Sequence, residues 1–135
     1  MVNLKITTAL FTVLLLFSCS HKSETETLFS HADTLIEEYP DSVLQSLDLS
    51  PEEIEGLSDK ECARYALLLA RATDKCKLSL LPCDSLLNVA LDYYDDDEKE
   101  KAIALLYKGR LAVEMEKAEE ATTCFQKGLT IIQDF

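Results

Sequence analysis

Apolar residues recur at helical spacing through most of the chain, most clearly from Ala102 to Gln133. The first half of this stretch carries the apolar set Leu105, Leu106, Tyr107, Leu111, Ala112 and Met115. The second half carries Ala118, Ala121, Phe125, Leu129 and Ile132. Only Glu116-Lys117 separates the halves, which predicts an antiparallel helical hairpin with a tight turn. Small residues at 109 and 121 favour close approach of the two backbones, with the ring of Phe125 filling the space beside them.

The preceding part of the chain predicts four more helices, over residues 28–38, 41–47, 60–77 and 84–94. Pro40 separates the first two, because a residue before proline is pushed out of the helical region while proline itself suits a first helical position. Ser58 or Asp59 caps the third helix. Its apolar arc is wide, which indicates burial on two sides. The arc consists of Cys62, Ala63, Tyr65, Ala66, Leu67, Leu69, Ala70, Ala72 and Thr73.

No stretch alternates with period two for long enough to predict a strand, and 135 residues leave room for one domain. Ala90-Leu91 precedes Gly128-Leu129 by 38 residues, which is typical of a repeated helix pair. We therefore expect an all-α domain over residues 28–135, built of about three antiparallel helix pairs.

The last hairpin resembles a tetratricopeptide repeat (TPR), a helix–turn–helix unit of about 34 residues. The residues that match its large and small positions are Leu105, Gly109, Ala121, Phe125, Gly128 and Leu129. The departures are Lys108 for the usual Leu, Ala112 for the usual aromatic residue, Glu116 for the turn Gly and Gln133 for the closing Pro. The resemblance implies a right-handed array of helix pairs whose first helices line a concave binding face.

Segments 39–42, 63–70, 74–75 and 84–86 look like the N-terminal part of TPR lipoproteins of the Bacteroides group. Those proteins are generally longer, often with a later membrane helix and coiled coil, and some carry a regulatory output domain. The resemblance implies a scaffold of the bacterial cell envelope that binds a protein or peptide partner. The alternative is a truncated N-terminal sensory segment of a longer TPR regulatory protein.

Residues 1–18 have the features of an export signal. Lys5 is their only charge, and the run of apolar residues and threonines from Ile6 to Leu16 is too short to span a bilayer but suits a signal-peptide core. The abrupt change to polar residues after Cys19 favours a processed signal.

The sequence Leu16-Phe17-Ser18-Cys19 resembles a bacterial lipobox. The resemblance implies cleavage before Cys19, diacylglycerol on its thiol and an acyl chain such as palmitate on the new N-terminus. An ordinary secretory signal with an incidental cysteine is the alternative. Ser20, rather than Asp, implies the outer membrane. Residues 19–27 contain no large apolar side chain and predict a flexible tether.

The charge of the chain limits its partners. Its formal net charge is −12, and removal of residues 1–18, which contain Lys5 and no acidic residue, makes it −13. Such a protein repels nucleic acid and anionic lipid unless it holds a local basic stripe. No nucleophile–base arrangement, Gly-rich phosphate loop or zinc-ligand spacing is found, so we expect no enzyme activity, no cofactor and no metal.

The cysteines beyond Cys19 are Cys62, Cys76, Cys83 and Cys124. Cys62 and Cys76 lie on one predicted helix, about 21 Å apart, and cannot form a disulfide with each other. Cys76 and Cys83 flank a loop and are able to pair, although small buried thiols are the favoured interpretation. A redox or metal-responsive protein is a third and weaker class of function.

The TPR resemblance also implies a partner-binding face. The long helix of the second pair contributes Arg64, Arg71 and Lys75, together with Lys60, and these lie on one stripe. The first helix of the last pair contributes Ile103, Leu106, Arg110, Val113 and Glu114. The basic stripe suits an acidic peptide or a chain-terminal carboxylate. The alternative is a solvated face whose charges pair with neighbouring acidic residues.

The C-terminal helix carries Leu129, Ile131, Ile132 and Phe135 without a polar cap after it. Because solenoid arrays usually end in a polar capping helix, we expect this helix to pack on a second copy, a partner or further repeats.

Overall fold

The computed structural model describes residues 24–96 and 98–135, and within these ranges the chain is all-α, without strands. Residues 1–23, which include the predicted signal peptide and Cys19, lie outside the described part. The first described helix covers residues 24–35. The elements that follow are α2 (Pro40–Ser46), α3 (Pro51–Glu55), α4 (Asp59–Lys75), the 3-10 turn η1 (Leu81–Cys83), α5 (Asp84–Tyr93), α6 (Lys99–Glu114) and α7 (Ala118–Gln133).

Local sequence explains where several helices begin and end. Ser58 caps α4 in a capping box with Glu61, and Ser50 caps α3 in the same way. Pro40 and Pro51 stand at first helical positions, where the missing N–H costs nothing. The turn between α6 and α7 needs a left-handed residue, and Glu116 supplies it with φ 59°.

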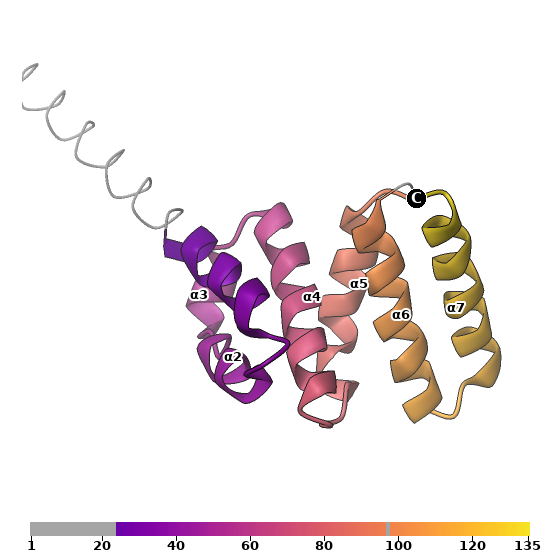
Figure 1. Ribbon diagram of the computed structural model, residues 1–135, viewed down its shortest axis with the longest axis horizontal. Helices are drawn as coiled ribbons and strands as arrows, with labels where there is room; N and C mark the ends of the chain where they lie inside the picture. The colour runs from indigo at the N-terminus through magenta and orange to yellow at the C-terminus, as the bar shows by residue number, and fades with distance from the viewer. Residues whose placement is uncertain (1–23, 97) are drawn as a thin grey trace, which may run out of the picture.

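The helices form a row in which each long helix packs against the next in the chain (Figure 1). Residues 24–35, α2 and α3 lie at one end of the row, α4, α5 and α6 follow, and α7 closes the other end. The helix α4 also contacts α6, so that α5 lies beside both. This arrangement places α4 and α6 as neighbours along one side of the molecule.

One core cluster joins the first helix to α2 and α4. Phe29, Ile36 and Leu47 are completely buried, and the ring of Phe29 stacks on that of Tyr65 with centroids 6.2 Å apart. The Tyr65 hydroxyl donates a 3.0 Å hydrogen bond to the carbonyl oxygen of Leu47. This buried aromatic pair fixes the first helix against α4.

A second cluster joins α4, α5 and α6. It contains Ala70, Leu80, Cys83, Leu87, Tyr107 and Leu111, all buried. Residues from three successive helices therefore bury their apolar faces together, as expected from the wide apolar arc of α4.

The hairpin of α6 and α7 forms as predicted, but α7 is rotated from its predicted orientation. Its buried residues are Ala121, Cys124, Gly128 and Ile131, whereas Phe125, Leu129 and Ile132 remain substantially exposed. On α6, Leu106 and Met115 are also exposed. The physical reason is backbone approach at Gly128, where an added Cβ would lie only 3.3 Å from the carbonyl oxygen of Ala102. The small-residue face of α7 therefore packs most closely on α6, while the ring of Phe125 reaches Gly109 of α6 from the edge of that face, and Leu129 and Ile132 remain exposed.

Three further observations qualify the sequence-based expectations. Residues 24–27, expected in the tether, are helical, and Thr25 is buried. Cys76 and Cys83 are both free thiols, so the disulfide is not formed; Cys83 lies 3.9 Å from the Thr73 hydroxyl instead. Within the described ranges, none of the helices has the length and apolar character needed to cross a bilayer.

Candidate functional site

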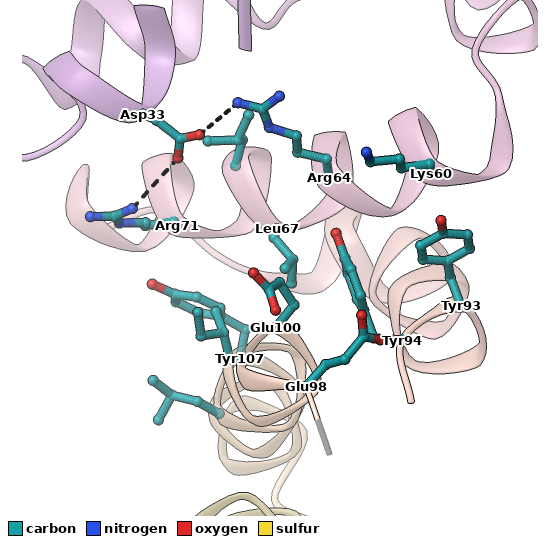
Figure 2. Close-up of a pocket in the computed structure, with 13 residues that line it drawn as sticks. Asp33, Lys60, Arg64, Leu67, Arg71, Tyr93, Tyr94, Glu98, Glu100 and Tyr107 are labelled. Atoms are coloured by element: carbon teal, nitrogen blue, oxygen red, sulfur yellow. Dashed lines mark hydrogen bonds and ion pairs between the residues drawn. The ribbon is translucent and has the colours of Figure 1, made fainter. Parts of the chain in front are cut away.

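A groove with a volume of about 660 Å³ lies between α4 and α6, with the end of α5 at one side (Figure 2). The helix α4 supplies one wall, α6 supplies the other, and the first helix contributes Asp33 at the rim. Its lining residues are Asp33, Lys60, Arg64, Leu67, Leu68, Arg71, Tyr93, Tyr94, Glu98, Glu100, Ile103, Leu106 and Tyr107.

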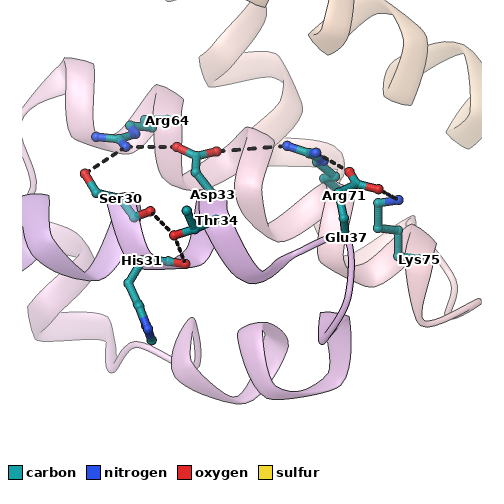
Figure 3. Close-up of polar contacts among 8 residues, drawn as sticks. All are labelled: Ser30, His31, Asp33, Thr34, Glu37, Arg64, Arg71 and Lys75. Atoms are coloured by element: carbon teal, nitrogen blue, oxygen red, sulfur yellow. Dashed lines mark hydrogen bonds and ion pairs between the residues drawn. The ribbon is translucent and has the colours of Figure 1, made fainter.

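The basic wall of the groove is held by ion pairs with the first helix and the turn after it (Figure 3). Arg64 donates to Glu26 at 2.8 Å and to Asp33 at 2.9 Å. Arg71 pairs with Asp33 at 4.0 Å and also with Glu37. Lys75 completes the row with a 2.6 Å contact to Glu37.

These ion pairs form a ladder with a regular register. Glu26, Asp33 and Glu37 follow one another at spacings of seven and four residues, and Arg64, Arg71 and Lys75 have the same spacings. Each acid lies 38 residues before a base that it contacts: Glu26 before Arg64, Asp33 before Arg71 and Glu37 before Lys75. The same interval separates Ala90 from Gly128. The two charge stripes therefore match because both helices have the same period.

The ladder changes the titration of its acids. A hydrogen bond from Arg64 lowers the pKa of Glu26, and the charge of the same guanidinium adds to the effect. Hydrogen bonds from Lys75 and Arg71 lower the pKa of Glu37. The structure thus places acidic partners along most of the predicted basic stripe, as in the alternative interpretation, although these exposed pairs are weak individually.

Lys60 differs from the other cations of α4. It lies at the mouth of the groove near Tyr93 (Figure 2), and it forms no direct ion pair with any of the described residues. The positive charge of Lys60 makes only a minor contribution to the lowered pKa of Glu26. Lys60 is thus the cation of the groove that is most available for an anionic group.

Three tyrosines line the groove. Tyr93 is exposed and meets Tyr94 edge to face, with ring centroids 5.2 Å apart. Burial, with a contribution from the charge of Glu100, raises the pKa of Tyr94 to about 12. Burial also raises the pKa of Tyr107. Both phenols are therefore protonated at neutral pH and are able to donate a hydrogen bond.

The wall formed by α6 is partly apolar. Ile103 and Leu106 are exposed and three residues apart, so they lie on neighbouring positions of the α6 surface. Together with the Tyr93 ring, they give the groove an apolar side opposite its basic wall. A site with one charged wall and one apolar wall suits an amphipathic segment.

The structure brings together only some of the predicted site residues. Arg64, Arg71, Ile103 and Leu106 line the groove, but Lys75, Arg110, Val113 and Glu114 do not.

Internal contacts account for three of the four residues outside the groove. Lys75 belongs to the ladder, and Arg110 pairs with Asp74 at 2.7 Å. Glu114 accepts hydrogen bonds from the backbone N–H of Leu80 at 3.0 Å and from the Ser79 hydroxyl at 2.9 Å. Its role is to hold the loop after α4.

Sequence reasoning did not assign Tyr93, Tyr94 or Glu100 to the site. The paired tyrosines at the end of α5 are the signal that could have identified this part of the groove, because exposed aromatic residues are common at binding surfaces.

The described residues include no group of three or more His, Cys, Asp or Glu side chains close enough to hold a metal ion. The acidic segment before α6 has local partners: Glu98 accepts a 2.7 Å hydrogen bond from the N–H of Asp95. Neither a family model, nor a curated protein, nor a solved structure matches the chain.

Proposed function

We propose that this chain is a TPR-like, envelope-anchored interaction module that binds a peptide segment of another protein in the groove between α4 and α6. The observation that carries this proposal is the composition of the groove: the free cation Lys60 and two arginines on one wall, and exposed Ile103 and Leu106 on the other. The proposed role is binding without catalysis.

The TPR-like part of the proposal is supported by how the helices pack. Antiparallel pairs follow one another in a row, and each pair buries its apolar face on the next (Figure 1). In such arrays the first helices of the pairs line the binding face. Here α4 and α6 hold those positions, and they form the groove.

The chemistry of the groove defines the proposed ligand. A carboxylate of the segment pairs with Lys60, and the protonated Tyr94 hydroxyl is available as a donor. An apolar side chain of the same segment covers Ile103 and Leu106, which removes their exposed surface from water. The ligand is therefore a short amphipathic segment that carries at least one acidic residue.

Selection of binders from a random peptide library by the purified chain tests this proposal. We expect acidic residues and a large apolar residue to be enriched, and we expect Lys60→Glu or Ile103→Asp to weaken the selected peptides about tenfold or more. Val89→Asp is the matched control, because Val89 on α5 is 41% exposed against 38% for Ile103 and does not line the groove. Equal losses for Val89→Asp and Ile103→Asp contradict the proposal.

We also propose that Cys19 carries a lipid that anchors the module in the outer membrane of the cell envelope. Cys19→Ser should release the chain from the membrane fraction and remove the mass of the acyl groups from its N-terminus. A membrane fraction that keeps the variant at the wild-type level contradicts this part of the proposal.

A further inference from the structure

An apolar band crosses the outer side of α7 and the adjoining edge of α6. Phe125, Leu129 and Ile132 recur at helical spacing on α7, with exposed fractions of 38%, 59% and 48%. On α6, Val113 lies one turn after Gly109, over which the Phe125 ring lies, and is exposed. We call Phe125, Leu129, Ile132 and Val113 the end face. The helix α7, which carries three of these residues, closes the helix row in Figure 1.

The same molecule shows how an equivalent face is covered. In the preceding pair, the small residue Ala70 of α4 and the large residue Leu87 of α5 are both completely buried. They share a cluster with Tyr107 and Leu111 of α6, an aromatic residue and a leucine four positions apart. In the next pair Gly109 and Phe125 are related in the same way, but the Phe125 ring remains 38% exposed.

Tyr107 and Leu111 of α6 cover the face formed by Ala70 and Leu87, and α7 presents a similar pair of side chains. Phe125 and Leu129 are an aromatic residue and a leucine four positions apart, like Tyr107 and Leu111. The helix α6 also runs antiparallel to the α5 helix that it covers (Figure 1). A two-fold axis perpendicular to α7 places the second α7 antiparallel to the first, which reproduces that polarity.

The charge of the surface also favours a second copy of this chain as the partner that covers the end face. The stripe of α7 that contains the end-face residues consists of Ala118, Thr122, Phe125, Leu129 and Ile132 and carries no charge, whereas the charged Glu119 and Lys127 lie elsewhere on the exposed surface of the helix. In a chain with a formal net charge of −12, an uncharged stripe allows two identical surfaces to meet without like charges at their centre. We propose that a second copy of this chain packs on the end face, with the two α7 helices antiparallel across a two-fold axis.

Site-specific photo-crosslinking in the full-length chain tests this proposal, with two differently tagged copies expressed together. The crosslinking amino acid replaces Thr122, on the outward stripe of α7, and replaces Thr34 in the control. The control is matched, because both threonines are exposed and both donate to the carbonyl four residues earlier. We expect a product with both tags and twice the chain mass from position 122, and little from position 34.

Leu129→Glu should then reduce the yield of this product about tenfold or more, because it places two carboxylates in the apolar contact. Leu78→Glu should leave the yield unchanged, since Leu78 is similarly exposed (54%) but lies in the turn after α4.

A product that joins the chain only to another protein, no dimer, or equal yields from positions 122 and 34 would each overturn the proposal. If Leu129→Glu lacks the helical circular dichroism of the wild type, the comparison of positions 122 and 34 decides alone. No groove substitution is involved, so failure here leaves the proposed peptide site untouched.

Discussion

The ring of Phe125 lies against the backbone of Gly109, so closely that a Cβ added at Gly109 would fall 2.4 Å from the ring atom Cε1. Gly109 is buried in the middle of α6, where glycine weakens a helix relative to alanine. The close contact explains why a residue without a side chain stands there. The contact between Phe125 and Gly109 joins the two helices of the hairpin and, in our proposal, supports the end face.

Gly109→Ala should therefore destabilise the chain by about 1–3 kcal/mol, because the Phe125 ring must shift or the helices must separate. In a Phe125→Ala background the obstruction is gone, and the same substitution should stabilise by about 0.5–1 kcal/mol through helix propensity. Urea unfolding of the four proteins of this cycle gives the coupling directly. An equal loss from Gly109→Ala in both backgrounds contradicts the account of the contact.

The charge ladder predicts a dependence of stability on pH. Hydrogen bonds from Lys75 and Arg71 lower the pKa of Glu37 in the folded chain below its ordinary value of 4.5. A lowered folded pKa means that the stabilisation is complete above about pH 4.5 and is lost as the pH falls further. Glu37→Gln should lower the melting temperature at pH 7, and its difference from the wild type should shrink at pH 3.

Glu38→Gln is the matched control for that experiment, because Glu38 is exposed beside Glu37 but makes no ion pair with the part of the chain that the structure describes. It should change the melting temperature less than Glu37→Gln at pH 7. A Glu37→Gln effect of the same size at both pH values would show that the ladder charges are not its cause.

The turn between α6 and α7 offers a stabilising substitution. Glu116 has φ 59°, a left-handed conformation that is costly for residues with a Cβ and easy for glycine. Glu116→Gly should raise the free energy of unfolding by about 0.5–1 kcal/mol, because relief of this strain exceeds the added entropy of the unfolded chain. Glu119→Gly, in the first turn of α7, should instead destabilise the chain by about 1 kcal/mol, because glycine weakens a helix and the acidic charge near the helix N-terminus is lost. Chemical denaturation of both variants measures the contrast.

The thiols should react slowly in the folded chain. Burial raises the pKa of Cys62, Cys83 and Cys124, which lowers the fraction of reactive thiolate at neutral pH. We expect alkylation of Cys83 and Cys124 by iodoacetamide at pH 7.5 to accelerate at least about tenfold in denaturant. Peptide mass spectrometry follows each site separately. If the alkylation rates of Cys83 and Cys124 did not change on unfolding, that result would contradict their buried positions.

Much of the fold could be predicted because its signals are local. The proline at 40, the serine at 58 and the short link at 116–117 determine helix ends through backbone chemistry that involves only neighbouring residues. The orientation of α7 could not be predicted in the same way. Apolar residues occupy two of its faces, and the contacts of Gly128 with Ala102 and of Phe125 with Gly109 together select the orientation of the helix.

The candidate site shows the same division. Arg64, Arg71, Ile103 and Leu106 were assigned to a binding face by the resemblance to TPR units, and they do line one groove. The pairing of the arginines with Asp33 and its neighbours was not found, since it depends on two helices lying side by side in one register. Spacing within a helix is visible in the sequence, whereas the register between helices is a result of packing.

Hydrogen exchange measured by mass spectrometry, with a library-selected peptide bound, is the most direct test of the proposed function. The account predicts slower exchange in segments 59–75 and 99–114, with α7 unchanged, and loss of this protection in Lys60→Glu. Protection confined to α7 or to residues 24–35, with α4 and α6 exchanging as in the free chain, would contradict it.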